Sequence, residues 1–250
     1  MTHPISIQEF KEKLKNLISN SSKITNPKVK DSLIRKLNFI SNNHFSKPGK
    51  PNFDKIKADT EVAFQRAIYN GITTQLQNES EIVKWIDIEV PVVLSENRRR
   101  PCIDIIGSNK DKLVLCELKF KKKSNPSDTP YYAVFELLIY YYFVRCNYEN
   151  LDEFNVFHDL ATTKNFKWEK YLKNSTPQLI VTANDSYWEY YLKRKDYKME
   201  LSKAIEELEN VLNIKVQLFK TKNENFDIQK QKGENETYCP KVTSNIWTEI

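Results

Sequence analysis

Two short apolar runs constrain the fold of this chain most strongly: RPCIDIIG (residues 100–107) and LVLCELKF (Leu113–Phe120). Each has the length and the content of aliphatic and β-branched residues that is typical of a buried β-strand. The segment between them, GSNKDK, is polar and begins with Gly107, so it predicts a hairpin. The chain must therefore build a sheet that contains this hairpin and cover the sheet with other elements.

Further helices and strands are predicted on both sides of the hairpin. Residues 85–94 alternate with period two, which places Asp87 and Glu89 on a solvated face, and Pro91 indicates a strand near a sheet edge. The other predicted strands are Gln178–Ala183 and Lys215–Thr221, and the predicted helices cover residues 6–20, 29–41, 59–72, 131–144 and much of 184–212.

This order of elements predicts an α/β fold with a mixed central sheet that is flanked by helices. We expect a small helical N-terminal extension over residues 1–55, a core over residues 56–222 and a polar C-terminal extension over residues 223–250. The apolar segment Tyr131–Val144 is too short to cross a bilayer and contains Glu136, so it predicts a buried helix and no membrane partner.

Three charged residues lie inside the apolar strands of the hairpin. Because side chains alternate along a strand, Glu117 and Lys119 share one face, and Asp104 on the preceding strand can face Glu117 across the ladder. Two carboxylates about 5 Å apart resist joint ionisation unless a cation lies between them, and a hard ion such as Mg²⁺ suits this oxygen pair. The bland alternative is an ion pair between Glu117 and Lys119 on a solvated strand face.

Lys119 beside such an ion has two plausible roles. It can position a water molecule and help to deprotonate it, or it can stabilise negative charge that develops on a phosphate. Carboxylates that hold a metal, an activated water and a nearby cation are what metal-assisted phosphodiester hydrolysis requires.

Asp104 followed by Glu117-Leu118-Lys119 on the next strand resembles the active-site signature of the PD-(D/E)xK nuclease superfamily. The resemblance implies a restriction-endonuclease-like αβββαβ core, which would cover about residues 59–221. It also implies that Asp104 and Glu117 bind one or two Mg²⁺ ions, for which Mn²⁺ can substitute, and that Lys119 serves the attacking water. Glu61, on the first core helix, matches an acidic position that often joins the metal site in this superfamily.

The sequence departs from the superfamily pattern at two positions. Ile103 precedes Asp104 where the pattern has proline, and Glu136 stands four residues before Tyr140 where several branches have Gln-x-x-x-Tyr. We interpret Glu136 and Tyr140 as supporting residues that reach the site from the buried helix.

Basic and aromatic residues near the predicted site give further candidates. Candidate phosphate contacts are Arg99, Arg100, Lys121, Lys122 and Lys123, although each is equally interpretable as part of a solvated loop. The aromatic cluster Tyr187, Trp188, Tyr190 and Tyr191 can stack bases, but packing against the sheet is its more common role.

The sequence therefore predicts a Mg²⁺-dependent nuclease, with DNA as its substrate and a role in prokaryotic restriction or defence by analogy. A catalytically silent nucleic-acid-binding protein of the same fold and an RNA-directed nuclease are the alternatives. A formal charge of +6 is compatible with a polyanionic partner. Four unpaired cysteines and an N-terminus without an apolar leader predict a cytoplasmic protein, and a homodimer or a partner subunit is left open.

Overall fold

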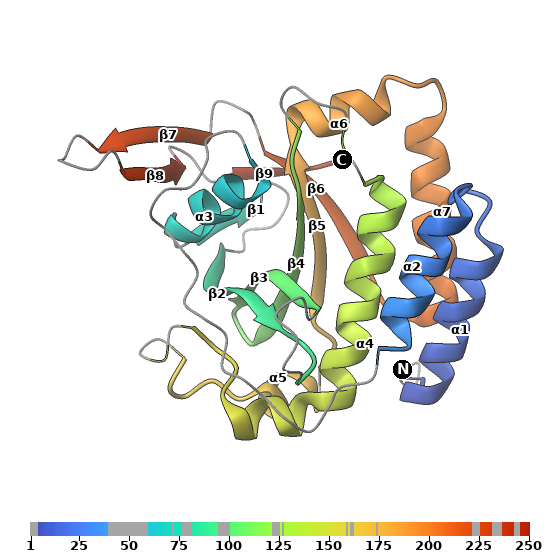
Figure 1. Cartoon of the computed structure of the whole chain (residues 1–250), viewed down its shortest axis with the longest axis horizontal. Helices are drawn as coiled ribbons and strands as arrows, with labels where there is room; N and C mark the ends of the chain where they lie inside the picture. The colour runs from blue at the N-terminus through green and yellow to red at the C-terminus, as the bar shows by residue number, and fades with distance from the viewer. Residues whose placement is uncertain are drawn as a thin grey trace.

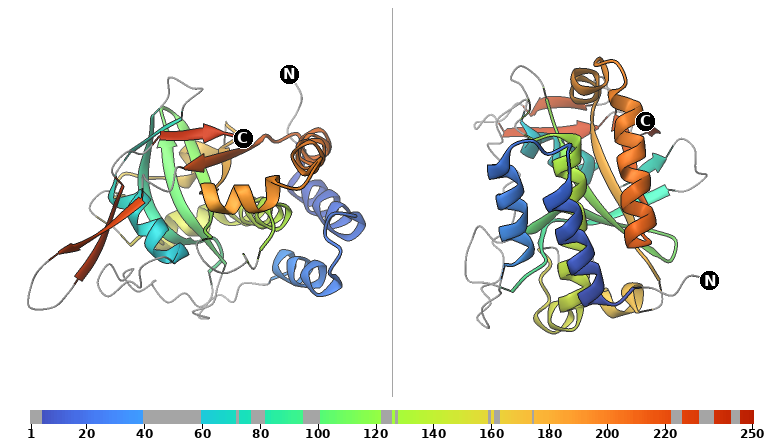
Figure 2. Two further views of the ribbon diagram at one scale, coloured as in Figure 1. Left: turned by 90° about the horizontal axis from the view of Figure 1, so that it is seen from above. Right: turned by 90° about the vertical axis from the view of Figure 1, so that its right-hand side faces the viewer.

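The computed structural model describes residues 5–39, 60–71, 73–76, 82–94, 101–121, 126, 128–158, 160, 163–173, 175–221, 226–231, 237–242 and 246–250. Seven strands form a closed mixed barrel in the order β1-β2-β3-β4-β5-β6-β9, and β7 and β8 form a separate two-stranded sheet. Helices α1, α2, α4 and α7 gather on one side of the barrel, and α3 lies on another side (Figures 1 and 2). The strands are β1 (Thr73–Leu76), β2 (Ile82–Pro91), β3 (Cys102–Asn109), β4 (Lys112–Lys119), β5 (Gln178–Asn184), β6 (Val216–Thr221), β7 (Phe226–Gln231), β8 (Thr237–Val242) and β9 (Ile246–Glu249).

The predicted restriction-endonuclease-like fold, with its open sheet and αβββαβ core, is wrong. Strand β9 pairs antiparallel with β6 and parallel with β1, and β1 pairs with β2, so the sheet closes on itself. Closure removes the free edges of the sheet. It also buries Trp247 of β9 against the rings of Trp85 and Phe219, with centroid distances of 5.4 and 6.3 Å. This burial gives an apolar driving force for closure.

The hairpin of β3 and β4 is confirmed, and its register pairs Ile105 with Cys116 and Asn109 with Lys112. The turn is tighter than GSNKDK predicts, because Gly107 lies within β3 and not in the loop. A Cβ atom on Gly107 would come within 2.8 Å of Trp85 Cε3 and of Val83 Cγ1. Glycine at this position therefore permits the close packing of Trp85 onto β3.

Two apolar cores lie on opposite faces of the strands. Val114, Cys116 and Leu118 of β4 belong to the core that is turned into the barrel, together with residues of α3 such as Phe64. Leu113 and Leu115 belong to the larger core, which the helices cover. Alternation along β4 thus assigns each of its residues to one of two environments, as the strand period requires.

Seven helices are described, and the N-terminal ones match the predicted positions. Ser6 caps α1 by accepting a hydrogen bond of 3.2 Å from the backbone N–H of Glu9. Phe10 of α1 packs edge-on against Tyr141 of α4, with ring centroids 5.5 Å apart. The helices are α1 (Ile7–Asn20), α2 (Pro27–Leu37), α3 (Glu61–Asn70), α4 (Pro130–Phe154), α5 (Trp168–Leu172), α6 (Asp185–Leu192) and α7 (Tyr197–Leu212).

Helix α4 is the most apolar of these elements and runs along the outer face of the strands. Its 25 residues include the predicted buried helix. Among the helices in the described ranges, none combines the length and the apolar character needed to cross a membrane.

Closure of the barrel makes a testable prediction about Trp247. We expect Trp247→Ala to lower the free energy of unfolding by about 3–5 kcal/mol, because the side chain is fully buried between two aromatic rings. Urea denaturation measures the change. Phe154→Ala, at a position 39% exposed, is the control and should cost far less. A small effect of Trp247→Ala would contradict the closed arrangement.

Candidate active site

The hairpin register brings Asp104 and Glu117 together. Ile105 pairs with Cys116, so the next step along the two strands sets Asp104 level with Glu117. Glu117 is on the face of β4 that the helices cover, as the neighbouring Leu115 shows, and the Asp104 side chain is contacted by Gln65 of α3. The ladder opens at this point, and the backbone N–H of Leu118 donates to Asp104 Oδ2 at 2.8 Å. The two carboxyl groups are close enough that Asp104 raises the pKa of Glu117.

Lys119 lies in the same cluster and is 5% exposed. Its Nζ atom is 2.7 Å from Glu117 Oε1, 3.3 Å from Glu136 Oε2 and 4.0 Å from Asp128 Oδ2. Burial by itself would lower the pKa of Lys119, but Glu117 and Glu136 outweigh it and raise this pKa well above its usual value. Lys119 is therefore held as a cation between carboxylates, and the alternative of a solvated surface ion pair does not describe it.

Helix α4 contributes Glu136 and Tyr140 to the site. Tyr140 donates from its hydroxyl to Glu136 Oε1 at 2.9 Å, and the same oxygen accepts a hydrogen bond from Lys36 Nζ. Burial would raise the pKa of Glu136, but Lys119 and Lys36 lower it to about 2. Glu136 and Tyr140 thus support the site from the helix, as the sequence predicts.

Glu61 stands at the first position of α3 and stays exposed to solvent. It accepts a hydrogen bond from the backbone N–H of Phe120, so it lies at the end of β4. Loss of solvent around the carboxyl group raises the pKa of Glu61, although the nearby Lys119 ammonium group acts to lower it. Glu61 therefore belongs to the rim of the cluster.

This site contains more carboxyl groups than ammonium groups, and burial opposes the ionisation of two of the carboxyl groups. Burial raises the pKa of Asp104 to about 7, against the opposing effect of Lys119. Burial also raises the pKa of Glu117 well above its usual value, and Asp104 adds to the rise. Burial therefore disfavours the charged forms of both groups, and a cation bound between them would favour those forms.

The donor set suits a hard divalent cation. Glu117 Oε2 is buried and accepts no hydrogen bond from an N–H or O–H donor of the described residues, and the Glu117 carboxyl group shares a hydrogen bond with Glu136. No group of three or more His, Cys, Asp and Glu side chains in the described part of the chain is arranged to hold a metal ion. Mg²⁺ is commonly held by only one or two protein carboxylates, with water and substrate phosphate filling its other positions. Asp104 and Glu117 fit this mode of binding.

Other predicted residues fall at the edge of the site or outside the description. Lys121 follows β4, two residues after Lys119, and its backbone is hydrogen-bonded on both sides by the Asn184 amide. Arg99, Arg100, Lys122 and Lys123 lie outside the described residues. Tyr187, Trp188 and Tyr191 of the aromatic cluster are buried, so they pack as core residues.

Sequence reasoning missed three residues that complete the site. Gln65 of α3 donates from its amide to the backbone oxygen of Asp104 at 2.8 Å and to Asp104 Oδ1 at 3.3 Å. Arg66 donates to Gln65 Oε1 and forms an ion pair of 2.9 Å with Glu89. Lys36 reaches Glu136 from the N-terminal helix α2. Polar residues in the otherwise apolar middle of α3 were a usable signal, whereas nothing marks Lys36 among the many surface lysines.

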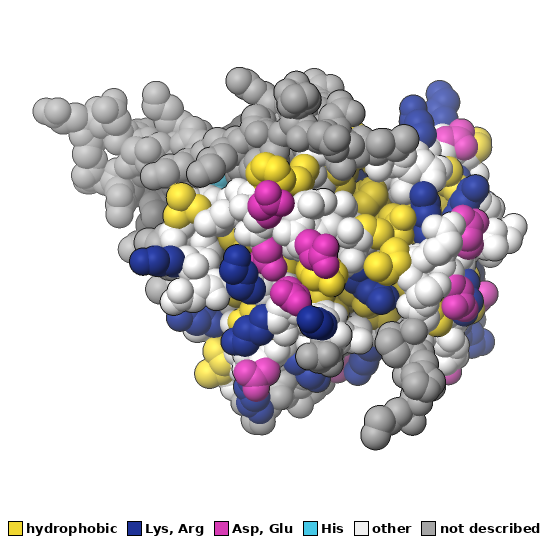
Figure 3. Space-filling view, turned by 90° about the horizontal axis from the view of Figure 1, so that it is seen from below, with side chains coloured by type: hydrophobic (Ala, Val, Ile, Leu, Met, Phe, Trp, Pro, Cys, Tyr) yellow, Lys and Arg dark blue, Asp and Glu magenta, His cyan; other side chains and the backbone are white. Residues whose placement is uncertain are grey.

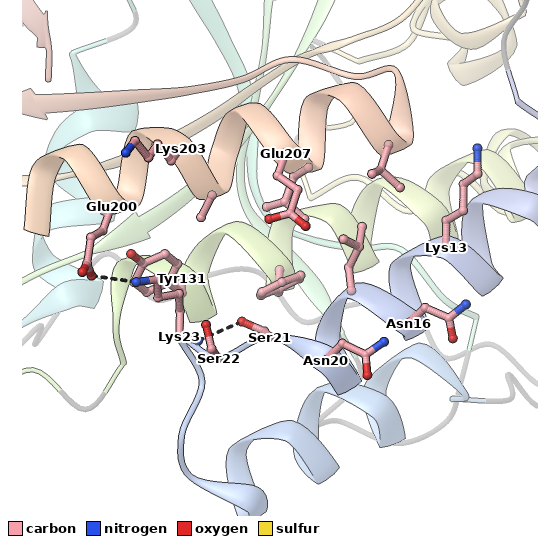
Figure 4. Close-up of a pocket in the computed structure, with 15 residues that line it drawn as sticks. Lys13, Asn16, Asn20, Ser21, Ser22, Lys23, Tyr131, Glu200, Lys203 and Glu207 are labelled. Carbon is pink, nitrogen blue, oxygen red and sulfur yellow. Dashed lines mark hydrogen bonds and ion pairs between the residues drawn. The ribbon is translucent and has the colours of Figure 1, made fainter.

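A separate pocket of about 580 Å³ lies between α1, α4 and α7 (Figure 4). Lys23 and Glu200 form an ion pair of 2.8 Å beside Tyr131 at its wall. Lys203 and Glu207 also line it, so its charges are mixed. The carboxylate cluster contributes no residue to this pocket, and we assign the chemistry to the cluster.

Comparison of the chain with family models, with curated proteins and with solved structures gives no match. The functional argument therefore depends on the residues of the cluster.

The raised pKa of Glu117 makes a prediction about stability. In the unfolded chain Glu117 loses its proton near pH 4.5, whereas in the folded protein it keeps the proton up to a higher pH. The contribution of Glu117 to stability therefore falls as the pH rises above about 4.5. We expect Glu117→Gln to raise the melting temperature in EDTA at about pH 8 and to have a smaller effect at about pH 4.5. Differential scanning fluorimetry measures both.

The same experiment with Mg²⁺ tests the cation. Millimolar Mg²⁺ should raise the melting temperature of the wild type more than that of Glu117→Gln, because binding to the folded state stabilises it. An equal response of the two proteins would contradict a cation at Glu117.

Lys36 offers a second test of the charge balance. We expect Lys36→Met to lower the free energy of unfolding by about 1–3 kcal/mol near pH 7, because Glu136 loses a charged donor. Glu136 has a depressed pKa, so its contribution is present above about pH 4.5 and is lost as the pH falls towards about 2. The difference between wild type and variant in urea denaturation should shrink in that range. Lys36→Arg keeps the charge and is the control.

Proposed function

We propose that this protein is a Mg²⁺-dependent nuclease that hydrolyses phosphodiester bonds in DNA. The observation that supports this most is the pair Asp104 and Glu117, set level on adjacent strands, with the Lys119 ammonium group 2.7 Å from Glu117. The similarity of Asp104 and Glu117-Leu118-Lys119 to the PD-(D/E)xK signature supports the same chemistry at the level of the motif, independently of the fold.

In this proposal Asp104 and Glu117 hold the cation. The bound ion supplies a Lewis acid that neutralises charge on the scissile phosphate. The backbone N–H of Leu118 and the amide of Gln65 fix the orientation of the Asp104 carboxylate. Glu117 and Glu136 hold Lys119 in place, so its positive charge is fixed before the substrate arrives.

Cleavage assays with Lys119→Ala test the proposal. Supercoiled plasmid, single-stranded DNA and RNA are each incubated with wild type and variant, in Mg²⁺ or in EDTA. We expect wild-type cleavage of DNA only in Mg²⁺, and a loss of at least about 100-fold in the variant, because a charge fixed at the reacting phosphate is removed. Lys112→Ala is the matched control, since Lys112 is an exposed lysine at the other end of the same strand.

Cleavage that persists in EDTA, or full activity of Lys119→Ala, would contradict this mechanism. Cleavage of RNA alone would make the protein an RNA-directed nuclease. The second candidate is a silent nucleic-acid-binding protein, which is favoured by the engagement of the Lys119 ammonium group with Glu117 and Glu136. Binding of DNA without turnover in Mg²⁺ or Mn²⁺ would support that candidate.

A further inference from the structure

A compact basic surface lies beside the carboxylate cluster, on α6 and the turn that follows it. The turn between α6 and α7 carries Lys193, Arg194 and Lys195, and all three are exposed. None of them forms an ion pair with a carboxylate among the described residues, although Glu189 stands four positions before Lys193 and Asp196 follows Lys195. The positive charge of this turn is therefore uncompensated by ion pairs within the described structure.

Lys121 extends this surface towards the site. Its Nζ atom lies 5.5 Å from the centroid of the Tyr190 ring, and Lys193 Nζ lies 5.1 Å from the same centroid. Two ammonium groups gathered at one ring repel each other, and an anion bound beside them would relieve the repulsion. The C-terminal end of α6 favours cations in the turn by a modest amount, but it does not account for Lys121, which comes from the end of β4.

The surface is fixed in position relative to the catalytic cluster. Asn184, at the start of α6, donates from its amide to the backbone oxygen of Lys121 at 2.7 Å and accepts from its N–H at 3.0 Å. Tyr187 and Tyr191 of α6 both donate to the backbone oxygen of Asp128, whose carboxylate is 4.0 Å from Lys119. Helix α6 is thus joined by hydrogen bonds to the strand end and to the segment that border the site.

We propose that Lys121, Lys193, Arg194 and Lys195 bind the phosphate backbone of a nucleic acid and hold it beside Asp104 and Glu117. This inference rests on the proposed function, because it gives that substrate a path across the surface. The Tyr190 ring contacts two ammonium groups, so we assign it to holding them and not to stacking a base. The contacts are to phosphate, so the surface binds without regard to sequence.

The matched control is a basic group of the same size at the other end of the molecule. Lys164, Lys167 and Lys170 are exposed at and before α5, which lies at the end of the molecule opposite α6 (Figure 1). The view of that end from below shows acidic and basic side chains interspersed beside a hollow lined by hydrophobic ones (Figure 3). Loss of three charges there changes the net charge equally without touching the proposed path.

Fluorescence anisotropy with a labelled duplex and a labelled single strand, in EDTA so that no cleavage occurs, tests the surface. Lys193→Gln, Arg194→Gln and Lys195→Gln combined should weaken binding about tenfold or more at low salt and reduce the salt slope by about two to three. The control triple Lys164→Gln, Lys167→Gln and Lys170→Gln should stay within about twofold of wild type, since it leaves the phosphate contacts intact. Equal weakening by both triples, or by neither, would overturn the proposal.

Kinetics separate this inference from the proposed function. The turn triple is the variant that combines Lys193→Gln, Arg194→Gln and Lys195→Gln. If the wild type cleaves DNA, the turn triple should raise KM and leave kcat unchanged. Lys119→Ala should instead lower kcat and keep its affinity for DNA. If the turn triple cleaves DNA with an unchanged KM, the proposed phosphate-binding surface is wrong and the proposed nuclease activity is not affected. If the wild type does not cleave DNA, and only the turn triple binds DNA more weakly than the wild type, the proposed nuclease activity is wrong and the proposed surface is supported.

Discussion

The burial of Lys119 between Glu117 and Glu136 is the interaction on which the rest of this site depends. An ammonium group and carboxylates taken out of water cost several kcal/mol each, and only close, well-directed partners offset that cost. The partners come from three parts of the chain: β4 supplies Lys119 and Glu117, α4 supplies Glu136 and Tyr140, and α2 supplies Lys36. The packing of α1 and α2 on α4 is therefore part of the charge balance at the strand end, and the N-terminal helices do more than cover an apolar face.

The sequence predicted the central strands because their apolar runs are long, and it failed at the strands that close the barrel. Strands β1 and β9 have only four residues each, TTQL and IWTE, and no hydrophobic pattern distinguishes such segments from loops. Strand β2 has neighbours on both sides, but its pairing with β1 covers only Ile82–Lys84, so Pro91 lies where β2 pairs with β3 alone. Asp87, expected on a solvated face, is 1% exposed because a register shift between Trp85 and Asp87 interrupts the alternation. An irregularity of this kind depends on tertiary packing and leaves no local signature.

The site was more predictable than the fold, because strand alternation and hairpin register are local properties. Glu117 and Lys119 share a face by the period of two, and Glu136 and Tyr140 share a face by their spacing of four in a helix. The hairpin brings Asp104 of β3 near them. Lys36 could not be predicted, because it meets Glu136 across 100 positions of sequence. The basic turn at Lys193 was overlooked for a different reason. In the sequence this turn lies in a continuous helix-like stretch. In the structure α6 and α7 are separate helices, and Asp196 in the turn between them has a positive φ of 68°.

Without a bound cation, the electrostatics of the cluster favour one of the two roles considered for Lys119, and a divalent cation at Asp104 and Glu117 would act in the opposite direction. A lysine that deprotonates water must first lose its own proton, which requires a depressed pKa. Here Glu117, Glu136, Glu61 and Asp104 all raise the pKa of Lys119, so the group stays charged. A fixed positive charge in a buried site is suited to stabilising the negative charge that develops on a phosphate, since the low dielectric strengthens the attraction. Within the proposed reaction, a Lys119 that keeps its proton acts as a cation at the phosphate, and the proton of the attacking water then goes to another acceptor.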